Sequence, residues 1–185
     1  ISNICTLMPG VNRLTPKRFK IAPARSDTKP YPGGGDSPYK PILLFVVLQS
    51  IQNRDRAFCR GIIEFDKCRD RFSSLYKAIY SEVEIPDLES KVVQPFWYFG
   101  AGVPRIWDFV AQHEMTVPLK NAIAKGTQIK TLPKLQNLVA MAEINSNDLD
   151  LLNNEVAATA IRSYLISTYF MGMESQVASA VASLK

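Results

Sequence analysis

The chain has 185 residues, of which 46% are hydrophobic and 21% charged, and its 22 Lys and Arg against 17 Asp and Glu give a formal charge of +5. This length suits one domain with or without appendages, because domains commonly hold about 100–200 residues. The composition excludes collagen, a disordered chain and a repeat array. The strongest apolar run, residues 42–48, is far shorter than the about 20 residues that cross a bilayer.

The positive charge is concentrated at the N-terminal end. Residues 1–40 contain seven basic and two acidic side chains, whereas the other 145 residues contain 15 of each. Residues 1–38 also hold six prolines and three consecutive glycines, which disfavour a packed unit because proline removes backbone donors and glycine raises the entropic cost of order. The sequence therefore predicts a basic arm over 1–36 and a neutral domain over 37–185.

The domain is predicted to begin with a helix over about 41–53, because Pro41 is favourable at a helix start. This helix is apolar almost all round, which places it at the centre of the fold. A short strand follows at 61–65, and Asp66 is expected to cap a helix over about 67–80. A turn is expected at 85–87.

Two aromatic runs, 95–99 and 105–110, flank a glycine-rich segment and are typical of a hairpin. Beyond them, helices are expected over about 118–125, 133–143, 147–153, 155–170 and 173–184. Ser146 or Asn147, and Asn154, are suitable N-cap residues for two of these helices. The predicted fold class is α+β: a mostly helical domain with a small antiparallel sheet or hairpin, a winged-helix-like first half and a helical C-terminal half.

The sequence offers little for catalysis or metal binding. Cys5, Cys59 and Cys68 form no CxxC pair, so with His113 as the one further soft ligand they predict free thiols in a reducing cytoplasm rather than a zinc site. Asp87, Glu89 and Lys91 have the letters of a metal-dependent nuclease, but such ligands come from separate strands, not from five consecutive residues. His113 and Glu114 could form a general base with its orienting acid, yet no nucleophile accompanies them. We expect no cofactor for this chain.

The binding signal is stronger than the catalytic one. In the arm, basic residues are interleaved with Phe19 and Tyr31. This composition suits binding to a polyanion, because bound cations release its condensed counterions. The alternative interpretation is a solvated tail with ordinary surface lysines. Gln94, Pro95 and Tyr98 could form a rigid apolar pocket, while most of the aromatic run is expected to be core. The candidate contacts to a polyanion are Arg18, Lys20 and Arg25 in the arm and Lys120, Lys125, Lys130 and Lys134 in the body.

Several short motifs occur in an order that resembles a known family. They are SPYKPILL at 37–44, QPFWY at 94–98, Trp107-Asp108, LDLLN at 149–153, AIRSYL at 160–165 and Tyr169-Phe170. This order is similar to the sulfur-binding domains that precede HNH nuclease modules in type IV, modification-dependent restriction endonucleases. The resemblance covers about residues 37–171 and leaves the arm out.

The resemblance implies that the domain binds double-stranded, phosphorothioate-modified DNA. It makes Pro95 the proline of the sulfur pocket, with Gln94 and Tyr98 as neighbours and with Tyr39 and Lys40 near the DNA backbone. The resemblance also implies a basic loop that contacts DNA phosphates or base edges, for which the candidates are Lys120, Asn121, Lys125, Lys130 and Lys134. Sulfur is larger and less strongly hydrated than the oxygen it replaces, so an apolar cup favours it. The sequence departs from the family pattern at Gln94, where an aromatic residue is common, at Tyr98, where a small residue is frequent, and at Tyr39, where His is usual.

Three further expectations complete this interpretation. The chain begins at Ile1 and lacks the His and Asn residues of an HNH nuclease, so we expect further sequence, with any nuclease module and its divalent metal beyond Lys185. The alternatives are a reader of a different DNA modification and an assembly domain in which the last helix docks through Val177, Ala178, Val181 and Leu184. The protein is expected in the cytoplasm, without a membrane partner, with a homodimer left open.

Overall fold

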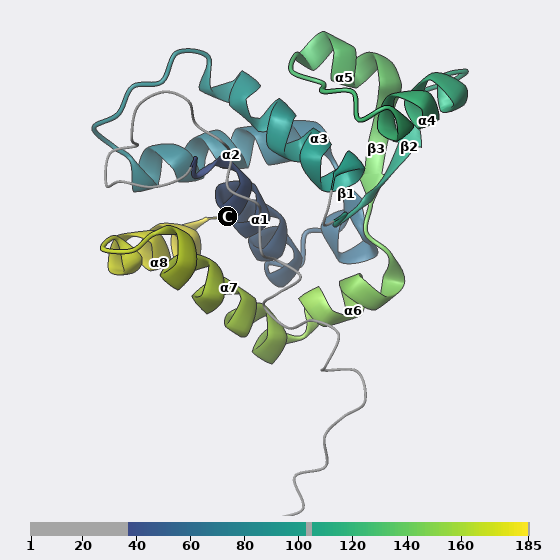
Figure 1. Cartoon of the computed structure of the whole chain (residues 1–185). Coiled ribbons are helices and arrows are strands. Elements are labelled where there is room, and N and C mark those ends of the chain that lie inside the picture. Colours follow the sequence, from purple (N-terminus) through teal and green to yellow (C-terminus); the bar gives the residue numbers. More distant parts are fainter. Residues whose placement is uncertain (1–36, 103–104, 185) are drawn as a thin grey trace, which may run out of the picture.

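A computed structural model describes residues 37–102 and 105–184 of the chain. These residues form a mostly helical α+β fold, which confirms the predicted fold class. In Figure 1, α1 occupies the centre, with α2 and α3 on one side of it and α7 and α8 on the other. The elements are α1 (Tyr39–Gln52), η3 (Phe58–Arg60), β1 (Ile62–Ile63), α2 (Phe65–Ile79), η4 (Leu88–Val92), α3 (Val93–Ala101), β2 (Asp108–Ala111), α4 (Thr116–Ala124), α5 (Leu132–Leu138), β3 (Val139–Glu143), α6 (Ser146–Asn153), α7 (Glu155–Tyr169) and α8 (Glu174–Ser183).

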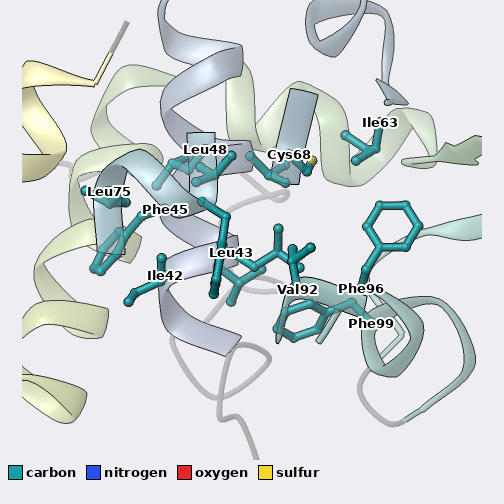
Figure 2. Packing of buried hydrophobic residues seen from close by; sticks show 14 of the residues in the cluster. Ile42, Leu43, Phe45, Leu48, Ile63, Cys68, Leu75, Val92, Phe96 and Phe99 are labelled. Atoms are coloured by element: carbon teal, nitrogen blue, oxygen red, sulfur yellow. The ribbon is translucent and has the colours of Figure 1, made fainter. Parts of the chain in front are cut away.

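The central helix α1 matches the predicted helix closely. Its first helical hydrogen bond runs from the amide of Ile42 to the carbonyl of Pro38, at 3.0 Å, so the amide that Pro41 lacks would have had no partner in the helix. All residues from 41 to 48 are buried. Figure 2 shows Ile42, Leu43 and Phe45 among apolar side chains of α2, η4 and α3. A helix that is apolar on every side is stable in water only when other elements surround it.

The polar C-terminal end of α1 connects the last three helices to the core. Gln52 donates from Nε2 to the carbonyl of Leu152 at the end of α6, at 2.5 Å, and Asn53 donates from Nδ2 to the carbonyl of Leu184 after α8, at 2.8 Å. Gln49 accepts from Nη2 of Arg162 on α7, at 3.1 Å. One turn of α1 therefore positions three helices that lie more than 90 residues further along the chain.

The sheet has the order β1-β3-β2 and is antiparallel throughout. Ala142 of β3 pairs with Ile63 on one side and with Phe109 on the other. The predicted helix over 133–143 is therefore wrong after Leu138, where α5 ends and β3 begins. Two partner strands supply backbone hydrogen bonds to this segment, and such tertiary pairing overrides a weak local preference for helix.

The predicted hairpin of 95–110 is also wrong, because the first aromatic run forms helix α3. Phe96 and Phe99 are fully buried, and the ring of Phe96 lies 5.2 Å from that of Trp107 and 5.8 Å from that of Phe109. The two aromatic runs thus pack as a helix against a strand segment. Gly100 permits this packing, because a Cβ atom there would lie 2.2 Å from the ring of Phe109.

Helix capping follows the prediction at one of three sites. The side chain of Asn154 accepts from the amide of Ala157, at 3.0 Å, as predicted. Helix α6 is capped by Asn145, which accepts from the amide of Asp148 at 3.0 Å, rather than by Ser146 or Asn147. Helix α2 begins at Phe65, so Asp66 lies in its first turn instead of capping it.

The final helix α8 uses its apolar face inside the chain. Val177, Val181 and Leu184 are buried, whereas Ala178 is exposed. Helix α8 contacts α1, α2 and α7, and the side-chain amide of Gln176 donates to the carbonyl of Ile79 at 2.8 Å. The face that the sequence suggested for a partner helix is therefore largely occupied by the domain's own core.

A charged pair ties the end of α1 to α2. Arg71 donates from Nη1 to Oγ of Ser50, at 2.7 Å, and from Nη2 to Oδ2 of Asp55, at 2.9 Å. Asp55 also accepts from the amide of Ala57, and its side chain is 13% exposed. Burial raises the pKa of Asp55, but the hydrogen bonds and charge of Arg71, with the contribution of Lys67, outweigh burial and lower the pKa below 3.8.

We predict that Asp55→Asn destabilises the fold by about 1–3 kcal/mol at neutral pH, because it leaves a largely buried guanidinium without its charged acceptor. A carboxyl group with a lowered pKa stabilises the folded state above its unfolded pKa and loses this effect as pH falls through its folded value. The difference between the two proteins should therefore shrink as pH is lowered below 3.8. Urea unfolding of both proteins at neutral pH and at a pH below 3.8 measures this difference in stability.

The matched control for this experiment is Asp66→Asn, because Asp66 is 67% exposed and pairs with Arg69 on the surface. Such exposed pairs contribute about 0–1 kcal/mol. An equal loss for both variants at neutral pH would contradict the importance assigned to the Asp55–Arg71 pair.

Candidate nucleic-acid interface

The start of α1 and the middle of α3 come together at one surface site. Lys40 is the second residue of α1, and its Nζ lies 3.3 Å from the centroid of the Tyr98 ring on α3. Both side chains are partly buried. Gly102 flanks the same ring, since a Cβ atom there would lie 3.0 Å from Cδ2 of Tyr98. Two residues that the sequence analysis grouped are thus in direct contact.

The electrostatics of Lys40 follow from this position. Burial lowers the pKa of its ammonium group, because a low-dielectric environment disfavours the charged form. The face of the Tyr98 ring is negative and attracts the cation, an interaction worth about 0.5–2 kcal/mol. The site therefore presents a cation that is incompletely hydrated and is held by an aromatic surface.

Tyr39 lies on a different side of α1 from Lys40. Its ring centroid is 5.9 Å from those of Phe72 and Tyr76, both on α2. Successive helical residues project about 100° apart, so neighbours in sequence face different elements. The structure places Tyr39 against α2 and Lys40 against α3.

Gln94 and Pro95 lie in the first turn of α3 rather than in a turn between strands. Gln94 is exposed, while Pro95 is buried. Gln94 and Tyr98 are four residues apart on the helix and so share one face. The accessible part of the predicted pocket therefore consists of Gln94, Tyr98 and Lys40.

The predicted basic contacts of the body lie on α4, α5 and the segment between them. Lys120 and Asn121 belong to α4, Lys125 follows its last residue, Lys130 lies in the connecting segment, and Lys134 belongs to α5. All five are exposed. Within 37–102 and 105–184, no carboxylate lies within 4.0 Å of the amino group of any of these lysines. Their charges are available to a polyanion.

Helix α3 holds this basic segment in place. The indole of Trp97 donates from Nε1 to the carbonyl of Thr127, at 2.8 Å, and the buried Ile129 anchors the segment further. The Trp97 ring also stacks on Phe109 of β2, with centroids 5.1 Å apart. Because Trp97 and Tyr98 are adjacent, one rigid helix positions both the Lys40–Tyr98 contact and the basic segment. This role of Trp97 was not predicted from the sequence, in which its indole donor was the available signal.

A cavity of about 350 Å³ lies between β2 and α4. Its lining includes Arg105, Phe109, Leu119, Lys120 and Ile123. Lys120 is the one member that the sequence analysis selected. Arg105 and Phe109 were missed because they were expected in a hairpin.

The remaining candidate residues are not part of the Lys40–Tyr98 contact or lie outside the described residues. Arg18, Lys20 and Arg25 fall outside the described residues. His113 and Glu114 are 94% and 84% exposed, with Nδ1 and Oε1 3.9 Å apart. Asp87 and Glu89 are exposed at the start of η4.

Three further features concern metal ligands, cysteine thiols and membrane-spanning helices. Over the described ranges, no three His, Cys, Asp or Glu side chains are grouped so that they could hold a metal ion. The thiols of Cys59 and Cys68 are free, and burial raises the pKa of Cys68 strongly. Of the helices in these ranges, none is long and apolar enough to cross a membrane.

Comparison with known proteins gives a likeness of fold. No protein-family model matches the sequence. No curated protein gives a significant sequence match. The fold is similar to a solved structure described as "Sulfur binding domain and SRA domain of ScoMcrA complexed with phosphorothioated DNA", with a TM-score of 0.53 and 17% identity over 88% of this chain and 45% of that chain. The chain thus spans less than half the length of that protein's chain, and the likeness confirms, for the fold, the resemblance seen in the sequence.

We predict that Tyr98→Leu lowers the pKa of Lys40 further. Leucine keeps the site apolar but removes the negative ring face that stabilises the ammonium group. The measurement is an NMR titration of the Lys40 Cε methylene. Tyr98→Phe is the matched control, because it keeps the ring and should leave the titration unchanged. Equal pKa values in the two variants would contradict a role for the ring.

Proposed function

We propose that the chain is a DNA-recognition domain of a modification-dependent restriction endonuclease and that it binds duplex DNA carrying backbone sulfur. The single observation that carries this proposal is the likeness in fold to a chain whose structure is described as complexed with phosphorothioated DNA. We assign the DNA contact to the surface that holds the Lys40–Tyr98 contact and the exposed lysines of 120–134.

The chemistry of this surface supports sulfur recognition. The Tyr98 ring and the stem of Lys40 offer polarisable, apolar surface beside a cation. A phosphorothioate has a poorly hydrated sulfur next to negatively charged oxygen, so it loses less hydration than a phosphate when it contacts such a surface. Lys40 neutralises the charge, Tyr98 contacts the sulfur, and Gln94 contacts the neighbouring backbone.

A reader of another modification is a second candidate. The specific observation in its favour is Tyr98 itself, because its large ring lies where the resembling family often has a small residue and is covered on one side by Lys40. The DNA cleavage activity and its divalent metal belong, in this proposal, to a part of the protein outside this chain. We also propose that the protein is located in the cytoplasm. Light scattering would measure whether it forms a homodimer.

We predict that the protein prefers a duplex with one phosphorothioate over the same duplex with a phosphate by about tenfold or more, equivalent to about 1.4 kcal/mol. Each sulfur diastereomer should be titrated separately, because only one directs sulfur at a given surface. Gel-shift titrations at several salt concentrations measure the ratio. Equal affinities at every salt concentration would sink the sulfur proposal and leave general DNA binding intact.

Variants at the site sharpen this test. Lys40→Gln should weaken binding to both duplexes, because it removes the cation that pairs with a phosphate. The matched control is Lys77→Gln, an exposed lysine on α2 outside the proposed site. Tyr98→Ala should change the ratio between the two duplexes, and an altered preference for a different modified duplex would favour the second candidate.

We predict that the arm supplies affinity without selectivity. Replacing Arg18, Lys20 and Arg25 together by Gln should weaken binding to both duplexes alike and reduce the slope of log K against log salt by about 0.9 for each phosphate that is no longer neutralised. A control with the same change in net charge replaces the exposed Arg54, Arg56 and Arg60 of the body. If the arm variant instead lost the preference for the phosphorothioate duplex, the arm and not the body would recognise the modification.

A further inference from the structure

The cavity between β2 and α4 has an apolar interior built from three elements. Phe109 and Ala111 come from β2, Leu119 and Ile123 from α4, and Gly100 from the end of α3. Gly100 lets the Phe109 ring approach the helix backbone, so the position and tilt of this wall are determined by packing. The volume of about 350 Å³ lies at the lower end of the range of small-molecule sites, about 300–1,000 Å³.

The lining of this cavity is polar in a specific way. Arg105 donates from Nη1 to Oδ1 of Asp108, at 3.1 Å, and both side chains remain about half exposed or more. Together they offer hydrogen-bond donors and acceptors side by side. Lys120 adds a cation with no carboxylate within 4.0 Å in the part of the chain that the structure describes. A ligand with a flat apolar body, a polar edge and a negative charge would complement all three features.

We propose that this cavity takes up a single nucleobase from the bound DNA strand, with the phosphate of that nucleotide held by Lys120. The inference rests on the proposed function and specifies a second contact that this function would use. The base lies against Phe109 and between the aliphatic side chains of α4. Its amino group donates to Asp108 and its ring nitrogen accepts from Arg105. This pattern suits the Watson–Crick edge of adenine or cytosine, where an amino group stands beside an unprotonated ring nitrogen; on the same edge of guanine the ring nitrogen carries a proton.

The energetics allow such a contact when the strand is locally distorted. Taking a base out of the stack costs free energy, and the cost is smallest where the base is mispaired or unpaired. Apolar contact with the part of Phe109 that lines the cavity and electrostatic contact between Lys120 and the phosphate offset this cost. The anchored basic segment of 125–130 lies directly after α4, so its cations can hold the backbone next to the captured base.

The test uses the full chain and small nucleotides as probes. Addition of dCMP or dAMP at millimolar concentration should shift the methyl NMR signals of Leu119 and Ile123, whereas deoxyribose 5-phosphate should not. Ala124→Phe should abolish the shifts, because Ala124 is exposed and its larger replacement fills the cavity. Val117→Phe, on an exposed position of α4 outside the cavity lining, is the matched control and should leave the shifts unchanged.

Equal shifts with deoxyribose 5-phosphate, or shifts that persist in Ala124→Phe, would overturn the proposal, because the base would then not be in the cavity. A phosphorothioate duplex with single abasic positions extends the test. One abasic position should weaken binding about fivefold or more, and Ala124→Phe should remove that effect. If the protein prefers the phosphorothioate duplex but no nucleotide shifts the cavity signals, the nucleobase proposal fails and the proposed function stands. If nucleotides shift the cavity signals but the protein binds both duplexes with equal affinity, the proposed preference for sulfur fails and the nucleobase site stands.

Discussion

Burial of α1 on every side is the constraint on which the rest of the structure depends. Ile42, Leu43 and Phe45 are fully buried, so the remaining helices must enclose this one. Helices α2, α3, α6, α7 and α8 all contact it. Only its two ends reach polar surroundings: the C-terminal glutamines and Asn53 hold the last helices, and the N-terminal end presents Lys40. The same packing that stabilises the domain therefore places the candidate site.

Helix α3 connects the central helix to the other parts of the candidate interface. Its buried aromatic face packs against α1 and the segment around Trp107, while Trp97 anchors the basic segment through Thr127. Tyr98, the next residue, holds Lys40. Because all these contacts belong to one short helix, a change in α3 should, in the proposed function, disturb shape-dependent and charge-dependent binding of DNA together. The cavity beside Phe109 depends on the same helix through Gly100.

The distribution of charge suits recognition by a local surface. The body has as many acidic as basic residues beyond position 40, so it exerts little net attraction on a polyanion. In the proposed function, selectivity comes from the partly desolvated Lys40 and its ring, and the arm adds affinity that depends on salt. In that proposal, this division would let a chain with a net charge of +5 distinguish two DNA backbones of nearly equal charge.

Much of the fold could be predicted from residue patterns alone. The uniformly apolar α1, the later helices and the Asn154 cap follow from local chemistry, and the motif order placed Lys40 and Tyr98 in one site before any contact was known. The sequence by itself did not determine that 95–99 is helical, that 139–143 is a strand, or that Phe109 forms a cavity wall. Aromatic and β-branched residues satisfy either period when buried, so pairing with distant strands and packing against α1 decided between them. Local preference is worth less than the hydrogen bonds and apolar area that only the assembled tertiary structure provides.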